Sequence, residues 1–127
     1  SPFRSAAGWL IGSDVGAFLS PPAGWCTGRG EVVEPEAVGG ELHLVVVKPP
    51  VGLSTAAVYG RVTVPPTPAA GDDVRRALRA GDAEGVAARL HNRLQGPAFA
   101  AAPLVETAFR RLAAAGPLGC LLSGSGS

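Results

Sequence analysis

The 127-residue sequence predicts a mixed fold, α/β or α+β, because its segments change character in a set order. Short apolar runs separated by Gly and Pro fill the first part of the chain and predict strands. From residue 54 onward, apolar residues recur at helical spacing. A further apolar run, PLGCLL, predicts one more strand before the terminal SGSGS.

The strand region is punctuated by turn residues. SPFRSAAGWLIG is typical of the last turns of a helix that ends at Gly12, and GAFLS and GWCTG predict two strands that meet at a Pro-Pro turn. VVEPE predicts a short strand that Pro35 ends. ELHLVVVKPP is the clearest strand pattern, because its β-branched run lies between Gly-Gly and Pro-Pro, as in a central strand.

The helical region begins after the Pro-Pro pair. Ser54 or Thr55 is the predicted N-cap of a helix through AAVYGRV. GDDVRRALRAG places acids at its start and arginines later, which suits both ends of a helix dipole, and its arginines are read as a solvated face. Asp82 is the predicted cap of DAEGVAARLHNRLQ, which has one apolar stripe (Val86, Leu90 and Leu94). PLVETAFRRLAAAG begins with proline and ends with glycine, as helices often do.

Composition excludes several classes of protein. Hydrophobic residues make up 46% and charged residues 17% of the chain, which argues against disorder driven by charge. A net charge of +1 argues against nucleic acid as the main partner. The apolar runs are too short to span a bilayer, and no signal-peptide pattern is visible, so no membrane partner is expected.

The two cysteines and the two histidines show no metal-ligand spacing, so no metal site is expected. Cys26 and Cys120 lie far apart with no CxxC motif, and reduced, partly buried thiols are the expectation. The chain begins with Ser rather than Met and ends abruptly, so we expect it to be a fragment of a longer protein.

Three polar clusters are candidates for chemistry. Asp14, between a Gly-Ser turn and an apolar run, either deprotonates a hydroxyl or satisfies backbone N–H groups of the turn. Thr55 follows the predicted central strand and either contacts a substrate or belongs to an ordinary helix cap. Tyr59, one helical turn later, either stacks on a base or packs. The terminal SGSGS is either a linker or a loop that holds phosphate with its N–H groups and hydroxyls.

Five segments in order, GSDVGAF, CTGRGE, VVVKPPVGLSTAAVY, LHNRLQGPAF and GPLGCLLSGSGS, resemble the GHMP family of small-molecule kinases. The resemblance runs from about Leu10 to Ser127. GRGE and KPPVGLSTAAVY are most similar to the members that phosphorylate 4-diphosphocytidyl-2-C-methyl-D-erythritol, rather than to mevalonate or homoserine kinases.

The resemblance implies a role for each cluster. Asp14 matches the catalytic base of the family, Thr55 matches the threonine near the methylerythritol group, and Tyr59 matches the aromatic residue that lies against cytosine. The terminal segment matches the glycine-rich loop beside the phosphate site (Ser123, Gly124, Ser125 and Gly126). The implied reaction is transfer of the ATP γ-phosphate to a tertiary hydroxyl of a cytidine diphosphate ester, with ATP and Mg²⁺ as cofactors. A monomer or a homodimer is expected.

The resemblance also implies an α+β fold. Residues 1–39 would end a ribosomal-protein-S5-like N-terminal domain, and residues 40–127 would form a ferredoxin-like GHMP kinase C-terminal domain, truncated at its end. The chain departs from the family in having Gly16-Ala17 where Pro-Phe is usual. The N-terminal lysine motif and the glycine-rich ATP loop have no counterpart, so the chain alone is expected to be inactive. The alternatives are another GHMP kinase or a non-catalytic ligand-binding α/β module.

Overall fold

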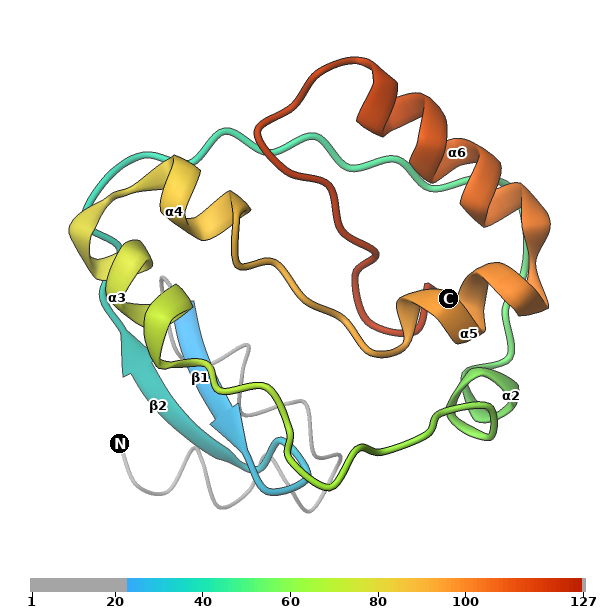
Figure 1. Ribbon diagram of the computed structural model, residues 1–127, viewed down its shortest axis with the longest axis horizontal. Coiled ribbons are helices and arrows are strands. Elements are labelled where there is room, and N and C mark those ends of the chain that lie inside the picture. The colour runs from blue at the N-terminus through green and yellow to red at the C-terminus, as the bar shows by residue number, and fades with distance from the viewer. Residues whose placement is uncertain (1–22, 127) are drawn as a thin grey trace.

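The computed structural model describes residues 23–126, which form an α+β arrangement of one two-stranded antiparallel sheet and five helices (Figure 1). The predicted helix that ends at Gly12, the strand GAFLS and Asp14 lie outside the described residues. The elements follow one another as β1 (Ala23–Thr27), β2 (Val32–Glu36), α2 (Thr55–Tyr59), α3 (Asp72–Ala80), α4 (Ala83–Ala87), α5 (Gln95–Ala101) and α6 (Pro103–Ala114).

β1 and β2 form a hairpin, which confirms the strands predicted for GWCTG and VVEPE. They pair antiparallel with Ala23 opposite Glu36. Pro35 lies within β2, opposite Gly24, so the prediction that it ends the strand is wrong. A proline is tolerated there because each strand of a two-stranded sheet has one edge without a ladder partner.

The hairpin is joined to α3 by charged side chains. The Glu36 carboxylate, only 6% exposed, accepts hydrogen bonds from Arg75 Nε and, at 2.6 Å, from Arg79 Nε. Arg75 also donates to Glu34 at 3.0 Å, and its guanidinium lies 5.0 Å from the ring centroid of Trp25. The prediction of a solvated arginine face is therefore wrong for Arg75, because the hairpin packs on this side of α3.

These contacts set the protonation of the cluster. The hydrogen bond from Arg75, together with that from Arg79 and both positive charges, holds the pKa of Glu36 below its ordinary value, although burial acts in the opposite direction. The same hydrogen bond raises the pKa of Arg75. The hairpin is thus attached to α3 by an ionised pair at neutral pH.

The helix ends follow the predicted chemistry. Asp82 Oδ1 accepts from the Gly85 N–H at 2.9 Å and caps α4. Pro103 is at the start of α6, and Gly116, with φ of 81°, follows its C-cap. Glycine suits that position because left-handed backbone is costly for other residues.

The helix predicted from Ala83 through Gln95 is wrong in its length. α4 ends at Ala87, residues 88–94 are irregular, and a separate helix, α5, begins at Gln95. Pro97 explains the new start, because proline is tolerated in the first turn of a helix but breaks a helix interior. The predicted stripe is lost with the helix, and Leu90 is 37% exposed.

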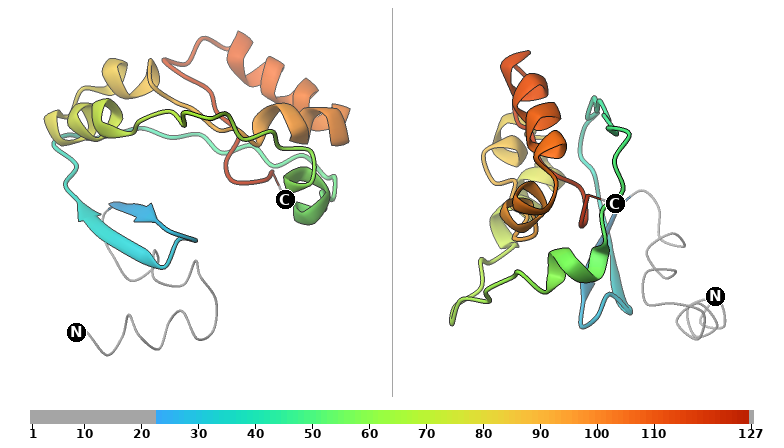
Figure 2. Two further views of the ribbon diagram at one scale, coloured as in Figure 1. Left: turned by 60° about the horizontal axis from the view of Figure 1, so that its bottom comes forward. Right: turned by 90° about the vertical axis from the view of Figure 1, so that its right-hand side faces the viewer.

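The buried apolar residues of the described chain are small and lie mostly on the helices: Val58, Ala77, Ala98, Ala102 and Val105. Phe99 of α5 and Phe109 of α6 add an aromatic pair with ring centroids 5.1 Å apart. Figure 2 shows helices α3 to α6 gathered on one side of the extended segment that runs from β2 to α2. Alanines at these positions let the helices approach one another closely.

Two predicted strands are not strands. Residues 41–49 and 117–122 are extended but join no ladder within the described chain. Leu44, Val45 and Val46 are 82%, 76% and 88% exposed, the opposite of a central strand. A strand needs a neighbour to accept its backbone hydrogen bonds, and residues 23–126 provide none for either segment. Within the described residues, no helix is long and apolar enough to cross a bilayer.

Candidate functional site

The N-terminus of α2 fixes the first predicted site residue. Ser54 has an extended backbone, and its hydroxyl accepts from the Ala57 N–H at 3.2 Å. Ser54 is therefore the cap, and Thr55 is the first helical residue. This arrangement leaves the Thr55 hydroxyl available for tertiary contacts.

Thr55 meets the terminal glycine-rich segment. Its Oγ1 lies 3.1 Å from Ser125 Oγ, a hydrogen bond between residues 70 positions apart. Ser125 is only 8% exposed. The structure thus brings together two clusters that the sequence predicted separately, the Thr55 segment and the SGSGS segment.

The glycine loop (residues 123–126) is a tight turn. The Gly126 N–H donates to the Ser123 carbonyl at 3.1 Å, and Gly124 and Gly126 have φ of 56° and 81°. Within residues 23–126, the N–H groups of Ser123 and Gly124 donate no hydrogen bond to another protein atom. Both residues are exposed, so these N–H groups are open to a ligand. Successive backbone N–H groups in such a turn favour an anion.

The glycine loop is held by side chains that the sequence analysis assigned to a helix. Asn92 Nδ2 donates to the Leu122 carbonyl at 2.6 Å and to the Gly124 carbonyl at 2.7 Å. Gln95 Oε1 accepts from the Leu122 N–H at 3.0 Å. The available signal was Pro97, because proline disfavours a helix that continues through it from the N-terminal side and so favours a break near Asn92.

Tyr59 lies at the end of α2, one turn beyond Thr55, and is 59% exposed. The neighbouring Val58 is fully buried, so α2 presents one packed side and one open side. The packing alternative for Tyr59 is not supported, because most of its side chain remains in solvent. Asp14 lies outside the described residues, so its place relative to Thr55 and Tyr59 stays a prediction.

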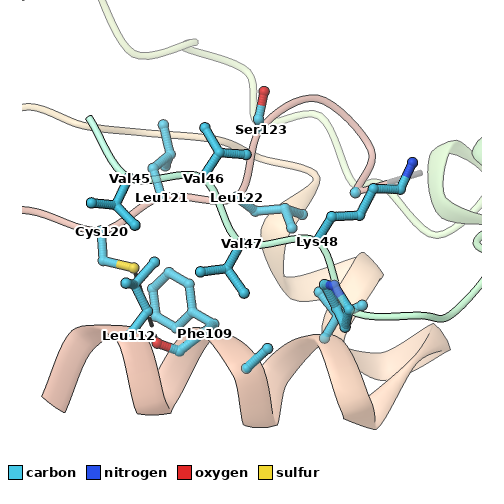
Figure 3. Close-up of a pocket in the computed structure, with 14 residues that line it drawn as sticks. Val45, Val46, Val47, Lys48, Phe109, Leu112, Cys120, Leu121, Leu122 and Ser123 are labelled. Atoms are coloured by element: carbon cyan, nitrogen blue, oxygen red, sulfur yellow. Dashed lines mark hydrogen bonds between the residues drawn. The ribbon is translucent and has the colours of Figure 1, made fainter. Parts of the chain in front are cut away.

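An apolar groove of about 230 Å³ adjoins the glycine loop. Figure 3 shows the segment with Val45 to Lys48 and the segment with Cys120 to Ser123 close together, facing Phe109 and Leu112 of α6. Ser123, Gly126 and Lys48 all line it. Apart from Lys48, Ser123 and the weakly polar Cys120 thiol, the lining side chains are apolar, so we assign the groove no chemical step.

The described residues contain no group of three or more His, Cys, Asp or Glu that could hold a metal ion. Both cysteines are free thiols, and Cys26 is exposed rather than partly buried as predicted. Cys120 is half-buried, with Sγ 4.0 Å from the Phe109 carbonyl. Neither thiol belongs to the polar cluster around the glycine loop.

No family model matches the chain. Curated proteins named 4-diphosphocytidyl-2-C-methyl-D-erythritol kinase nevertheless match most of it. The protein of Rhodopirellula baltica is 38% identical over 92% of this chain and 37% of its own length. That of Streptomyces avermitilis is 41% identical over 91% of this chain and 41% of its own length.

A relative from Mentha piperita, named as the chloroplastic enzyme, is 37% identical over 92% of the chain and 30% of its own length. The chain therefore spans about two fifths or less of the length of these relatives. The resemblance read from the motifs is confirmed: over more than nine-tenths of its length, this chain is a relative of the 4-diphosphocytidyl-2-C-methyl-D-erythritol kinases.

Proposed function

We propose that a complete protein containing this chain transfers the γ-phosphate of ATP to the 2-hydroxyl of 4-diphosphocytidyl-2-C-methyl-D-erythritol, a step of non-mevalonate isoprenoid synthesis. The main support is the similarity to kinases of that name over 91–92% of the chain. The proposal includes a cytoplasmic location, and it holds that this chain alone is inactive. The chain contains no counterpart of the family's glycine-rich ATP loop, and it spans about two fifths of its relatives.

We further propose the domain assignment that the resemblance implies. Residues 1–39 would end the S5-like N-terminal domain, and residues 40–127 would belong to the ferredoxin-like C-terminal domain. The change from the β1–β2 hairpin to the helical layer after residue 40 supports a boundary there. The Glu36–Arg75 pair would then be a contact between the two domains.

The substrate end of the proposed site lies on α2. Thr55 would hold the methylerythritol part through its hydroxyl, and the exposed Tyr59 ring would stack on the cytosine. The one-turn spacing of these two residues puts them on the same side of α2. An exposed aromatic ring suits this role because a base can stack its flat face on the ring without a hydrogen bond.

The phosphate end of the proposed site is the glycine loop. The exposed N–H groups of Ser123 and Gly124 fit an anion, which supports placing the ATP phosphates beside this turn. The Thr55–Ser125 hydrogen bond sets the two ends of the site side by side, as transfer between two bound molecules requires. Bound ATP would supply the phosphoryl group.

Mg²⁺ is part of the proposal only through ATP. The described residues offer no carboxylate cluster for it, so no step is assigned to it here. Mg²⁺ commonly keeps several waters and binds through substrate phosphates and one or two carboxylates. Asp14 would act as the base and accept the proton that the substrate hydroxyl loses.

A chimaera tests the proposal. Residues 10–127 replace the matching part of the Streptomyces avermitilis relative, and the product is assayed for ATP-dependent phosphorylation of the cytidine diphosphate ester. We expect phosphorylation, and we expect Asp14→Asn to lower turnover by ~100-fold or more. Asp73→Asn is the matched control, because Asp73 is exposed on α3 and pairs with Arg76.

The proposal fails if the folded chimaera leaves the substrate unphosphorylated while the Streptomyces parent phosphorylates it. That result would favour a non-catalytic ligand-binding module for this chain. Near-normal turnover of Asp14→Asn would instead remove Asp14 from the mechanism while leaving the kinase activity in place.

A further inference from the structure

We propose that Asn92 and Gln95 are positioning residues, which hold the glycine loop in the shape that binds phosphate. That the loop binds phosphate rests on the proposed function. That Asn92 and Gln95 hold the loop rests on the hydrogen bonds of the described residues. Neither side chain lies on the loop. Asn92 reaches the loop from the segment between α4 and α5, and Gln95, the first residue of α5, binds Leu122 just before the loop.

The Asn92 amide uses all of its polar atoms. Both N–H bonds of Nδ2 are engaged, one with the Leu122 carbonyl and one with the Gly124 carbonyl. Its Oδ1 accepts from the Leu94 N–H at 3.0 Å. Only one orientation of the amide satisfies these contacts, because carbonyls need a donor and an N–H needs an acceptor. The local turn at Leu94 therefore fixes how Asn92 faces the loop.

Gln95 acts on the residue that enters the loop. Its Oε1 accepts from the Leu122 N–H, and the Leu122 carbonyl is held by Asn92. Both backbone groups of Leu122 thus bind side chains, where a strand would use a neighbouring strand. Because the extended segment 117–122 has no ladder partner among the described residues, these two amides set its end.

The loop is held from a second direction by Thr55, through its hydrogen bond to Ser125. Asn92 and Gln95 fix the start and middle of the loop, and Thr55 fixes its far side. The exposed N–H groups of Ser123 and Gly124 lie between these attachments. Donors that are already in place cost no reorganisation when charge moves onto the phosphate, so this arrangement favours the reacting state.

The substitution Asn92→Asp would remove the two hydrogen bonds by which Asn92 holds the loop. Aspartate has nearly the shape of asparagine but only acceptor oxygens, so its carboxylate would face two carbonyls without a donor. It would also add a negative charge beside the phosphate site. The loop should then leave its present turn while Oδ1 still accepts from Leu94.

The first test uses the full 127-residue chain. Amide hydrogen exchange by NMR compares the wild type with Asn92→Asp and Gln95→Leu, and with Arg93→Gln as a control for the same segment. We expect at least ~10-fold faster exchange at Leu122 and Gly126 in both variants, because a lost hydrogen bond of about 1.4 kcal/mol is a factor of ten. The amides of α6 should be unchanged, which shows that each variant folds.

The second test places the same variants in the Streptomyces chimaera. We expect Asn92→Asp to lower kcat by ~10-fold or more with little change in KM for the cytidine ester, since α2 is not altered. Because a partly unfolded variant would also lower the apparent kcat at unchanged KM, turnover is normalised to the folded fraction measured by far-UV circular dichroism.

The outcomes separate the two proposals. Wild-type exchange at Leu122 and Gly126 in both variants overturns the positioning role, and so does an unchanged kcat for Asn92→Asp in an active chimaera. The wild-type chimaera can lack kinase activity while Leu122 and Gly126 still exchange faster in the variants. In that case the proposed function fails, and the attachment of the loop by Asn92 and Gln95 stands.

Discussion

Shortening Val58 to alanine should loosen α2 and with it the substrate end of the site. The Val58 side chain is fully buried on α2, which packs against α5. Val58→Ala removes two methyl groups, worth ~0.8 kcal/mol each as buried area, and leaves a cavity that costs ~1 kcal/mol more. The better helix propensity of alanine offsets part of this loss, on the order of 0.5 kcal/mol. The expected loss is about 2 kcal/mol in the free energy of unfolding.

Urea unfolding followed by far-UV circular dichroism measures this loss in the full chain. Tyr59→Ala is the matched control on the same helix, because Tyr59 is 59% exposed and its removal should change the free energy by less than ~0.5 kcal/mol. An equal small effect of both substitutions would refute the reasoning, since α2 would then gain no stability from its buried side. A loss of about 2 kcal/mol for Val58→Ala alone would support it.

The remaining predictions concern charge, recognition and backbone conformation. Because the pKa of Glu36 is lower in the folded chain than its ordinary value of 4.5, its stabilising contribution is present at neutral pH and is lost as pH falls through the folded-state pKa. The Trp25 indole resonance should therefore shift in that acid range in the wild type, and an identical shift in Glu36→Gln would contradict the assignment. Tyr59→Ala should weaken binding of cytidine diphosphate to the chimaera by ~10-fold in calorimetry, and unchanged affinity would remove the stacking role. Gly116→Ala, at φ of 81°, should destabilise the chain by ~1 kcal/mol in urea unfolding, whereas Gly96→Ala within α5 should stabilise it by ~0.5 kcal/mol; equal signs would refute the conformational argument.

Local chemistry in the sequence predicted most helix ends and the two strand segments of the hairpin. Ser54 and Asp82 cap helices because each short polar side chain accepts a hydrogen bond from a backbone N–H three residues later, so the interaction is local in sequence. The proline at the start of α6 and Gly116 after it mark that helix for the same local reason. The sequence analysis treated the glycine loop and the Thr55 segment as separate clusters, and the structure brings them together through the Thr55–Ser125 hydrogen bond.

The errors arose where partners distant in sequence decide the outcome. The Val45–Val47 run has strong strand preference, yet a strand is completed only by a neighbour, and the described residues supply none. Arg75 was read as solvated because its partner, Glu36, lies 39 positions away on β2. The segment around Asn92 has helical composition, but the Asn92 side-chain amide binds the glycine loop, and a new helix with Pro97 in its first turn begins at Gln95.

The sequence by itself determined the caps, the turns, the two strands of the hairpin and the family resemblance, because each depends on residue types within a short stretch of chain. Only the tertiary structure decided that Thr55 meets Ser125, that Asn92 and Gln95 hold the glycine loop, and that the β-branched run has no strand partner within residues 23–126. The physical reason is that hydrogen bonds between distant segments depend on how the chain packs, and the local preference of a segment does not specify which other segment becomes its partner.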